Sequence, residues 1–404
     1  MHALVYIRRH KGFDNIVLDY ARNNLKSTKI STISEYFNGN FRIDMNYPTW
    51  DYCSITQDFI EENLELDEII FRDRVLRNTP FKECLVLIRR ATGNIREIFK
   101  NNNFDVLVTY PVDNYIMDIL MQVAKINNIP IKGICSFFVS GFKRLTIYGE
   151  HNPIRNPSKN EVDLVLDTLK NNFRSHMSPS RGKALKSAII RYIKYKARYP
   201  IFYILGAKIL GRKEYDLLAT PYNTTVRNFY NFFVERHFTT PEKIDFEKKS
   251  ILIPLHYFPE ATIEYWSDNY HQIEFEDMLL CKIDELSERY DQIILKEHPA
   301  TVFDNPNSFY KLLKNNKKVI LIDPFVSTNE LLDKIAVLGC WTGSAGIEAL
   351  VNGKKVEFFV QEQYYYQALK LHPDIIQRDG KMISIKNPYL FIEEILKGSI
   401  PFEG

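Results

Sequence analysis

Polar side chains that can bind an anion follow several short apolar runs in the last third of the chain. They are His298, Ser327, Thr328, Thr342 and Ser344. The apolar runs 292–295, 319–322 and 335–338 alternate with helical periods, which is the pattern of a parallel α/β sheet. Ligands of such sheets bind at the carboxyl ends of the strands. The sequence therefore predicts an anion site at this edge of a sheet.

The segment 342–346 (Thr-Gly-Ser-Ala-Gly) consists of small residues and precedes a predicted helix. Free backbone N–H groups at a helix start favour a bound anion such as phosphate. Gly343 and Gly346 let the backbone approach such a ligand, and the hydroxyls of Thr342 and Ser344 can donate to its oxygens. The alternative is an ordinary strand-to-helix loop in which Ser344 is the N-cap.

His298 precedes Pro299, and since proline ends a strand for steric reasons, this pair also fits a plain loop. We expect His298 and the segment 342–346 at neighbouring strand ends. Together an imidazole and two hydroxyls can hold one phosphate group, which makes the combination a stronger signal than either part alone.

The motifs Lys-Glu-His-Pro at 296–299, Thr-Gly-Ser-Ala-Gly-Ile-Glu-Ala-Leu at 342–350 and Asn-Gly-Lys at 352–354 resemble the nucleotide-binding half of bacterial capsule polysaccharide biosynthesis proteins. These are GT-B-fold glycosyltransferases related to the Kdo transferases and to bacterial sialyl- and polysialyltransferases. The segments 253–260 and 71–77 are similar to further motifs of the family. The resemblance implies an α/β, GT-B-like fold with two Rossmann-like domains facing a cleft and a helical connecting segment.

The resemblance implies transfer of a sugar, Kdo or sialic-acid-like, from a CMP-sugar to a glycan or lipid-linked acceptor hydroxyl in capsule or lipopolysaccharide biosynthesis. In the relatives, the His of the His-Pro pair and hydroxyls at the later helix start hold the donor phosphate, which corresponds to His298 and to Ser344 with Thr342. The expected donor-binding residues are His256, Glu260, Lys296, His298, Pro299, Ser327, Thr328, Thr342, Gly343, Ser344, Ala345, Gly346 and Glu348.

No Asp-x-Asp pair lies near these residues. A hydrogen-bonding or protonated His298, the two hydroxyls and a helix N-terminus can stabilise the phosphate as it leaves. We therefore expect a metal-independent reaction with no cofactor beyond the nucleotide-sugar substrate.

A catalytic carboxylate is expected in the first half of the chain. Asp113 follows the apolar run 104–110, at the place where a general base for an acceptor hydroxyl belongs. The alternative is that Asp113 is the N-cap of the next helix. Asp73 and Glu150 are the competing carboxylates.

Four arginines of the first half could hold the donor carboxylate or an anionic acceptor. Arg8 and Arg9 follow the predicted strand 3–7, and Arg72 and Arg74 flank Asp73. The alternatives are a solvated turn and a self-satisfied surface ion cluster.

Composition and length describe a soluble globular protein of more than one domain. The 404 residues are 45% apolar and 25% charged, and the net charge of +3 is too small to indicate nucleic-acid binding. The scattered cysteines and the short apolar N-terminal run favour a cytoplasmic protein without a secretory signal. The expected regions are an N-terminal Rossmann-like acceptor-side domain (1–160), a helical, basic connecting region (161–247), a C-terminal nucleotide-sugar-binding Rossmann-like domain (248–385) and a helix that crosses back to the first domain (386–404).

The segment 181–213 carries ten Lys or Arg residues and no Asp or Glu, together with an amphipathic apolar pattern. Such a segment predicts peripheral contact with an anionic membrane, here the inner face of the plasma membrane. The alternative is an interdomain helix whose apolar side packs inward.

Other functions remain open on the same scaffold. They are a CDP-glycerol or ribitol-type polymer transferase, a UDP-sugar 2-epimerase, and a non-catalytic capsule assembly factor. The pocket of the epimerases usually carries more acidic residues at the helix start. This chain has only Glu348 after Gly346, which departs from that pattern.

Overall fold

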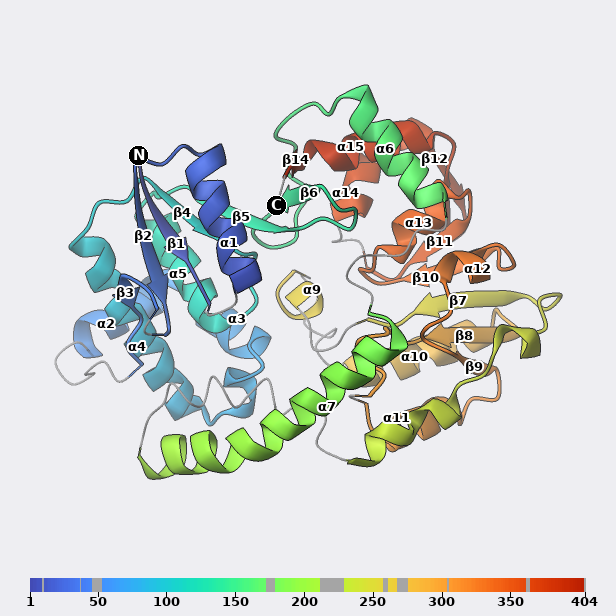
Figure 1. The fold of residues 1–404 in the computed structure, drawn as a ribbon, viewed down its shortest axis with the longest axis horizontal. Helices are drawn as coiled ribbons and strands as arrows, with labels where there is room; N and C mark the ends of the chain where they lie inside the picture. Colours follow the sequence, from blue (N-terminus) through green and yellow to red (C-terminus); the bar gives the residue numbers. More distant parts are fainter. Residues whose placement is uncertain are drawn as a thin grey trace.

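The protein is described by a computed structural model, which covers residues 1–8, 11–36, 38–45, 53–171, 179–210, 229–256, 261–266, 275–303, 305–360 and 364–402. Arg9 and Glu260, two predicted binding residues, lie outside these ranges. The chain forms two halves, each built around a seven-stranded sheet with helices on its faces (Figure 1).

The first sheet has the order β14-β6-β5-β4-β1-β2-β3. Five strands from β5 to β3 are parallel, and β6 and β14 add antiparallel neighbours at one edge. Its strands are β1 (His2–Tyr6), β2 (Lys29–Ser34), β3 (Phe41–Arg42), β4 (Val106–Thr109), β5 (Ile131–Ser136), β6 (Phe142–Leu145) and β14 (Ser399–Pro401). The helices of this half are α1 (Lys11–Asp19), η1 (Tyr20–Asn24), α2 (Cys53–Asn63), α3 (Leu66–Arg72), η2 (Leu76–Asn78), α4 (Phe81–Lys100) and α5 (Tyr115–Ile126).

The second sheet has the order β12-β13-β11-β10-β7-β8-β9, again with five parallel strands and an antiparallel pair at one edge. Its strands are β7 (Ser250–Pro254), β8 (Gln292–Lys296), β9 (Val319–Ile322), β10 (Val337–Cys340), β11 (Lys355–Phe358), β12 (Ile376–Asp379) and β13 (Met382–Ile385). The helices that follow β7 in the chain are α9 (Ala261–Glu264), α10 (Phe275–Ser287), α11 (Asn307–Leu313), α12 (Thr328–Leu332), α13 (Ala345–Val351), α14 (Tyr364–Lys370), η7 (Pro373–Ile375) and α15 (Pro388–Lys397).

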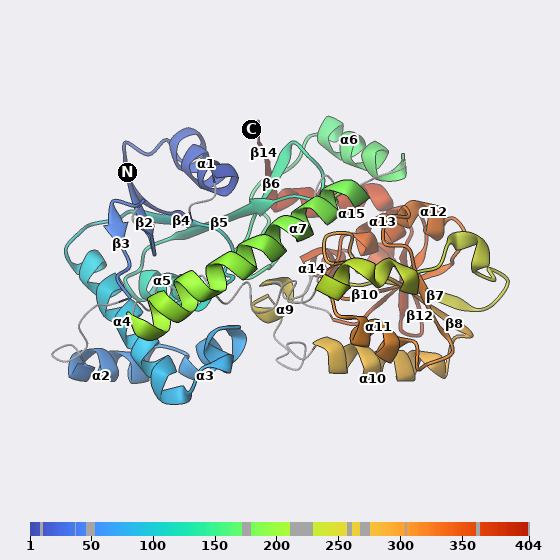
Figure 2. The same ribbon diagram turned by 60° about the horizontal axis from the view of Figure 1, so that its bottom comes forward.

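The middle of the chain is helical and packs on the second half. It contains α6 (Lys159–Lys170), α7 (Arg181–Arg198), η3 (Tyr199–Ile209), η4 (Phe229–His237) and η5 (Pro241–Lys243). α6 contacts α13 and α15, while Ala184 and Val234 join the core beneath α10 and α11. Figure 2 shows α7 as one long helix that runs from the second half across the front of the molecule.

The five parallel strands therefore have the same order in both sheets, in which the first strand of the half lies between its second and fourth strands. The order reverses between β1 and β4 in the first sheet and between β7 and β10 in the second. Outside the carboxyl ends at such a reversal, called the switch point below, α/β sheets bind their ligands. The predicted α/β fold with two Rossmann-like sheets is confirmed. One detail was wrong, since the strands before His298 and Thr342 are separated by β7.

Apolar runs become central strands because helices cover both faces of each sheet. All four residues of β4 and all five of β8 are buried, as expected for a parallel sheet with two covered faces. Among the described residues no helix is long and apolar enough to cross a membrane, and none of their His, Cys, Asp and Glu side chains form a group of three placed to hold a metal ion.

Two segments tie the halves together. The C-terminal strand β14 pairs with β6, so residues 399–401 complete the first sheet. Residues 261–266, between β7 and α10, reach the first half, where Tyr265 belongs to the hydrophobic core. In Figure 1, α9 lies between the two sheets.

Candidate functional site

The switch point of the second sheet is spanned by a contact between His256 and Thr342. His256 follows β7 and Thr342 follows β10, the two strands at which the order reverses. The Nε2 atom of His256 accepts a hydrogen bond from the backbone N–H of Thr342 at 2.9 Å. The Thr342 hydroxyl lies 3.3 Å from the His256 Nδ1 atom. A residue predicted only as a donor-side loop histidine thus holds the turn that precedes α13.

Aromatic side chains fix the ring of His256. Phe275 and Trp341 meet it edge-on at centroid distances of 6.1 and 6.2 Å. His256 is 9% exposed, and burial lowers the pKa of its imidazole to about 3. The positive charge of a protonated His298 contributes to this lowering. Both rings therefore act as neutral hydrogen-bonding groups at neutral pH.

His298 lies in the loop after β8, beside β7. Its Nδ1 atom accepts a hydrogen bond from the backbone N–H of Ala300 at 3.2 Å, so the Nε2 atom carries the proton of the neutral ring. Burial and the nearby Lys296 ammonium lower the pKa of His298 to about 4. Lys296 and Pro299 are themselves buried. The sequence left a protonated or a hydrogen-bonding His298 open, and the lowered pKa favours the neutral hydrogen-bonding form.

Glu297 positions the His298 loop, a role that the sequence analysis missed. Its carboxylate is 3% exposed and accepts hydrogen bonds from the Tyr310 hydroxyl and from the Asn305 amide. Through these two hydrogen bonds, Glu297 therefore fixes the position of the His298 loop. Only the burial of an acid at a strand end marks this role, and burial is not readable from one sequence.

The turn between β10 and α13 offers backbone donors. Across the part of the chain that the structure describes, the backbone N–H groups of Ser344 and Ala345 have no hydrogen-bond acceptor. A Cβ added at Gly343 would meet only His256, at 3.9 Å, so this side of the turn is open. Two unused N–H groups at such a turn form an arrangement that suits a phosphate.

Gly346 has a different role from the predicted one. A Cβ at Gly346 would lie 3.0 Å from the Tyr365 hydroxyl and 3.2 Å from the Cys340 Sγ atom. Tyr365 in turn donates a hydrogen bond to the carbonyl oxygen of Gly343 at 3.0 Å. Gly346 therefore admits the tyrosine that holds the turn, and its small size serves packing instead of ligand approach.

Ser344 is the N-cap of α13, as the alternative interpretation expected, but its side chain makes no capping hydrogen bond. Glu348, one turn further along α13, is 6% exposed, and burial raises its pKa to about 7, although the nearby Lys296 ammonium and the Ser344 hydroxyl act in the opposite direction. Glu348, which we predicted as a donor-binding residue, is therefore buried within the protein.

The remaining predicted donor residues lie further along the sheet. Ser327 is exposed, and Thr328 is half-buried at the start of α12. Both follow β9, which lies on the far side of β8 from β7 and β10. They are thus separated by two strands from the turn that carries Thr342.

The switch point of the first sheet is spanned by an ion pair. Arg8 follows β1 and Asp113 follows β4, and the guanidinium donates to both carboxylate oxygens of Asp113. Arg8 also lies 5.7 Å from the ring centroid of Tyr110. The side chains of Arg8 and Asp113 remain 25% and 31% exposed. The alternative reading of Asp113 as an N-cap is wrong, because Asn114 accepts the capping bond from the N–H of Met117 at 2.9 Å.

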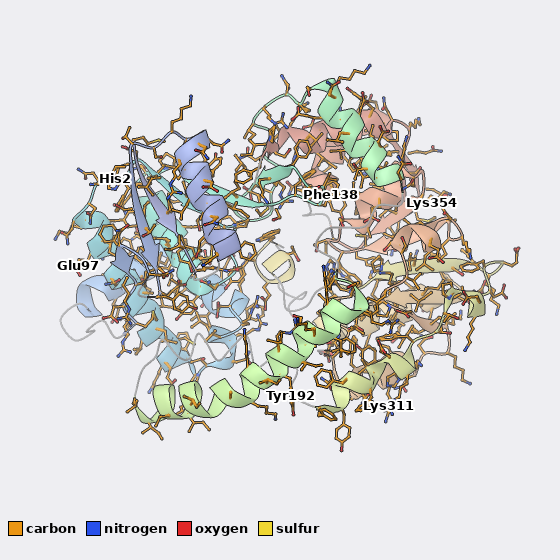
Figure 3. All side chains as sticks on the ribbon, in the orientation of Figure 1. His2, Glu97, Phe138, Tyr192, Lys311 and Lys354 are labelled. Atoms are coloured by element: carbon orange, nitrogen blue, oxygen red, sulfur yellow. The ribbon has the colours of Figure 1, made fainter. Side chains whose placement is uncertain are left out.

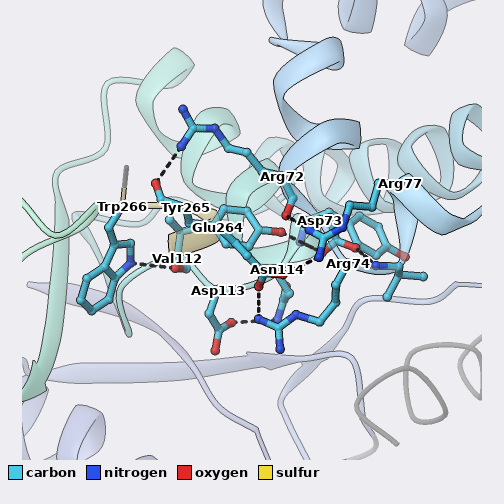
Figure 4. A network of polar contacts seen from close by, with 12 residues as sticks. Arg72, Asp73, Arg74, Arg77, Val112, Asp113, Asn114, Glu264, Tyr265 and Trp266 are labelled. Atoms are coloured by element: carbon cyan, nitrogen blue, oxygen red, sulfur yellow. Dashed lines mark hydrogen bonds and ion pairs between the residues drawn. The ribbon is translucent and has the colours of Figure 1, made fainter. Parts of the chain in front are cut away.

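Asp73, Arg72 and Arg74 hold a segment of the protein itself (Figure 4). The Glu264 side chain of α9 is fully buried and receives the guanidinium groups of Arg74 and Arg77. Arg72 donates to the backbone oxygen of Tyr265 at 2.8 Å. The acidic partner of Arg74 is thus Glu264 of the protein itself, and Arg72 binds the backbone next to it. The prediction that Arg72 and Arg74 face the substrate was wrong.

Asp73 is saturated by donors. Its carboxylate accepts hydrogen bonds from the N–H groups of Val75 at 2.7 Å, Leu76 at 3.0 Å and Tyr115 at 2.9 Å. The fourth donor is the Tyr265 hydroxyl, at 2.8 Å. Asp73 is 1% exposed, so it anchors loops and α9 and is not an open catalytic base.

The remaining contacts concern Trp266, in the segment 261–266 that reaches the first half, and Glu150, the third predicted carboxylate. The Trp266 indole N–H donates to the carbonyl oxygen of Val112 at 3.0 Å, one residue before Asp113. Glu150, the other competing carboxylate, accepts from the N–H of Ile147 at 2.9 Å and of Tyr148 at 2.7 Å within its own turn. Of the three predicted carboxylates, Asp113 alone lies at the switch point.

The comparisons with solved structures find several distant likenesses. Two are with KpsC of Thermosulfurimonas dismutans: its beta Kdo 2,7 transferase (12% identity, 76% of this chain and 79% of that chain, TM-score 0.34) and its beta Kdo 2,4 transferase (12% identity, 74% and 85%, TM-score 0.37). Another is with the UDP-GlcNAc 2-epimerase of Neisseria meningitidis (14% identity, 98% and 97%, TM-score 0.28). No curated protein matches the chain.

A family model decides the assignment. The model described as "Capsule polysaccharide biosynthesis protein" matches residues 169–372, half of the chain. This range includes His256 and Thr342, which meet at the second switch point, and also His298. The match confirms the resemblance read from the sequence, and the chain belongs to the capsule polysaccharide biosynthesis protein family.

Proposed function

We propose that the protein is a glycosyltransferase that transfers a sugar acid, Kdo or sialic-acid-like, from a CMP-linked donor to a glycan or lipid-linked acceptor hydroxyl. The observation that carries this proposal is the arrangement at the second switch point. There the Thr342 turn, held by His256, presents unused N–H groups, and His298 follows β8, the strand beside β7. Such a set suits a phosphate that becomes a leaving group.

The donor phosphate lies against the N–H groups of Ser344 and Ala345 and accepts a hydrogen bond from the Nε2–H of His298. When the bond between the anomeric carbon and the phosphate oxygen breaks, the oxygen keeps the electron pair. Its developing charge is met by donors already in place, so little reorganisation is needed during the reaction. The acceptor oxygen forms the new bond to the anomeric carbon.

Asp113 takes the proton from the acceptor hydroxyl in this proposal. The Arg8 guanidinium binds both oxygens of Asp113, and both side chains are partly exposed. The carboxylate of a sugar acid can compete with Asp113 for the Arg8 guanidinium, because both bind in the same two-pronged geometry. Substrate binding would then free Asp113 as a base, which links its availability to an acidic substrate.

The first test is turnover. Purified protein is incubated with CMP-Kdo or CMP-sialic acid and candidate glycan acceptors, and released CMP is measured. His298→Ala is expected to lower kcat/KM by about 100-fold or more with an unchanged melting temperature. Unchanged activity of this variant contradicts the assigned role of His298.

The second test concerns the nucleotide. CMP is expected to raise the melting temperature more than CDP or UDP at equal concentration, since bound ligand stabilises the folded state. Preference for CDP indicates a glycerol- or ribitol-phosphate polymer transferase, and preference for UDP indicates a 2-epimerase. Absence of any nucleotide effect indicates a non-catalytic assembly factor.

A further inference from the structure

The inner side of α7 is fixed to the second half. Ala184 and Ala188 are buried in the core of that half, and Leu185 and Tyr192 pack against it. Figure 3 labels Tyr192 on the helix. Arg191 donates to the carbonyl oxygen of Ala300 at 3.4 Å, two residues beyond His298. The helix therefore lies directly against the loop that carries the donor-side imidazole.

The outer side of the same helix and of η3 is apolar and open to solvent. Eight large aliphatic side chains are at least 41% exposed, and the exposed fraction reaches 59% at Ile193 and 67% at Ile209. They are Ile189, Ile190, Ile193, Ile201, Ile204, Leu205, Ile209 and Leu210. A soluble protein rarely leaves so many aliphatic side chains exposed on one element, unless that surface binds something.

Aromatic side chains of η4 extend this surface. Phe229 is 56%, Tyr230 67% and Phe233 54% exposed. The ring of Phe229 lies 6.5 Å from that of Tyr192, so η4 adjoins α7. Aromatic residues beside an aliphatic surface are typical of proteins that enter the boundary between water and lipid.

Positive charge is interleaved with the aliphatic residues. Lys183, Lys186 and Lys194 are exposed, and Lys186 shares a side of the helix with Ile190 and Ile193 because these residues are three or four apart. The segment 181–213 contains ten Lys or Arg and no Asp or Glu. The charge pattern of this surface therefore complements an anionic partner.

We propose that the outer face of α7 and η3, with the exposed rings of η4, docks on an anionic lipid bilayer. The aliphatic side chains enter the boundary between headgroups and acyl chains, and the lysines contact lipid phosphates. Figure 1 shows the helix extending from the second half to beneath the first, so one bound face spans both. This proposal does not depend on the proposed transferase activity.

The sign of the charge favours lipid over a second copy of the chain. A self-association through this face would bring the lysines of two copies together, where like charges repel. An anionic bilayer instead meets both the aliphatic residues and the cations. A helix that binds there from outside needs no spanning segment, because its long axis lies in the plane of the surface.

The test is flotation of the full chain with vesicles. Vesicles of phosphatidylcholine with one third phosphatidylglycerol are expected to carry the protein, and vesicles of phosphatidylcholine alone are not. The variant with Lys183→Glu, Lys186→Glu and Lys194→Glu is expected to bind about 100-fold more weakly. Replacing Lys311, Lys314 and Lys317 with Glu, a matched change of charge on another part of the second half, leaves binding unchanged.

A second pair of variants tests the aliphatic contact. The double variant Ile190→Glu with Ile193→Glu is expected to lose about tenfold or more in vesicle affinity. Leu164→Glu on α6, where the residue is 56% exposed, is the matched control and keeps full affinity. Equal binding to both vesicle types, or no binding to either, overturns the proposal. So does a dimer in solution that the Ile190 and Ile193 changes dissociate, since the face would then be an interface between copies.

Discussion

His256 and Thr342 lie 86 residues apart in sequence and are joined at 2.9 Å across the second switch point. Arg8 and Asp113 occupy the corresponding positions of the first sheet, 105 residues apart. In each half, a residue that follows the first strand is bonded to a residue that follows the fourth strand. These two contacts lie where α/β sheets bind their ligands, so we expect a bound ligand to contact or displace these residues.

Replacing His256 is expected to release the turn that carries Thr342. His256→Ala should weaken CMP binding by about tenfold, because the turn loses the acceptor that orients its N–H groups. His256→Gln should recover part of the affinity, since its side-chain oxygen can accept the same bond. Titration calorimetry with CMP measures both variants. Equal affinity of the alanine variant and the parent protein would show that the contact does not order the site.

The protonation of His298 should depend on the bound phosphate. In the free protein its pKa is lowered to about 4 by burial and by Lys296, so the ring is neutral at pH 7. A bound phosphate favours the imidazolium, so binding should take up a proton and strengthen as the pH falls from 7 to 5. Calorimetry in buffers of different ionisation enthalpy reports the proton. His298→Gln controls for the phosphate's own titration near pH 6, and an identical uptake in this variant contradicts the prediction.

Glu348→Gln is expected to stabilise the protein at alkaline pH. Burial raises the pKa of Glu348 to about 7, above its unfolded value, so its ionised form costs stability at pH 8. The cost appears as the pH rises from about 4.5 to 7 and is absent below that window. Glutamine keeps the shape without the charge, and unfolding at pH 8 should need about 1–3 kcal/mol more. Denaturant unfolding at pH 5 and pH 8 checks the sign; no gain at pH 8 refutes the assignment.

The contacts of Glu264 and Tyr265 with the first half should be the strongest polar link between the halves. Glu264→Ala leaves Arg74 and Arg77 without their carboxylate and should cost about 3 kcal/mol in the free energy of unfolding. Tyr265→Phe removes one hydrogen bond to Asp73 and should cost about 1 kcal/mol. Glu288→Ala, at an exposed position just after α10, is the control and should change stability by less than about 0.5 kcal/mol. If Glu264→Ala behaves like the control, the two halves are held by other contacts.

Sequence reasoning located most strands because their signal is local. The runs around Val106 and Ile293 are short, apolar and followed by polar residues, which is what two covered sheet faces require. The Thr342 turn was found for the same reason, since small residues mark a strand-to-helix connection. His298 also emerged from local signals, namely a strand end and the proline that follows it.

What the sequence could not supply was the set of partners brought together by folding. Asp73 was predicted as a competing catalytic carboxylate, but its oxygens are taken by donors that include Tyr265, which is 192 residues away. Gly346 was assigned to a ligand because the facing Tyr365 hydroxyl cannot be inferred from spacing. The neighbour order of the strands was likewise hidden, so the role of β7 between β8 and β10 went unpredicted.

The pairing of β14 with β6 has a consequence for how the chain matures. Ile400 pairs with Lys143, so the edge of the first sheet is closed by a strand that is synthesised long after the other strands of that sheet. Until then β6 exposes unpaired backbone groups, an edge open to wrong partners. Removing residues 399–402 should therefore destabilise the half that is synthesised first.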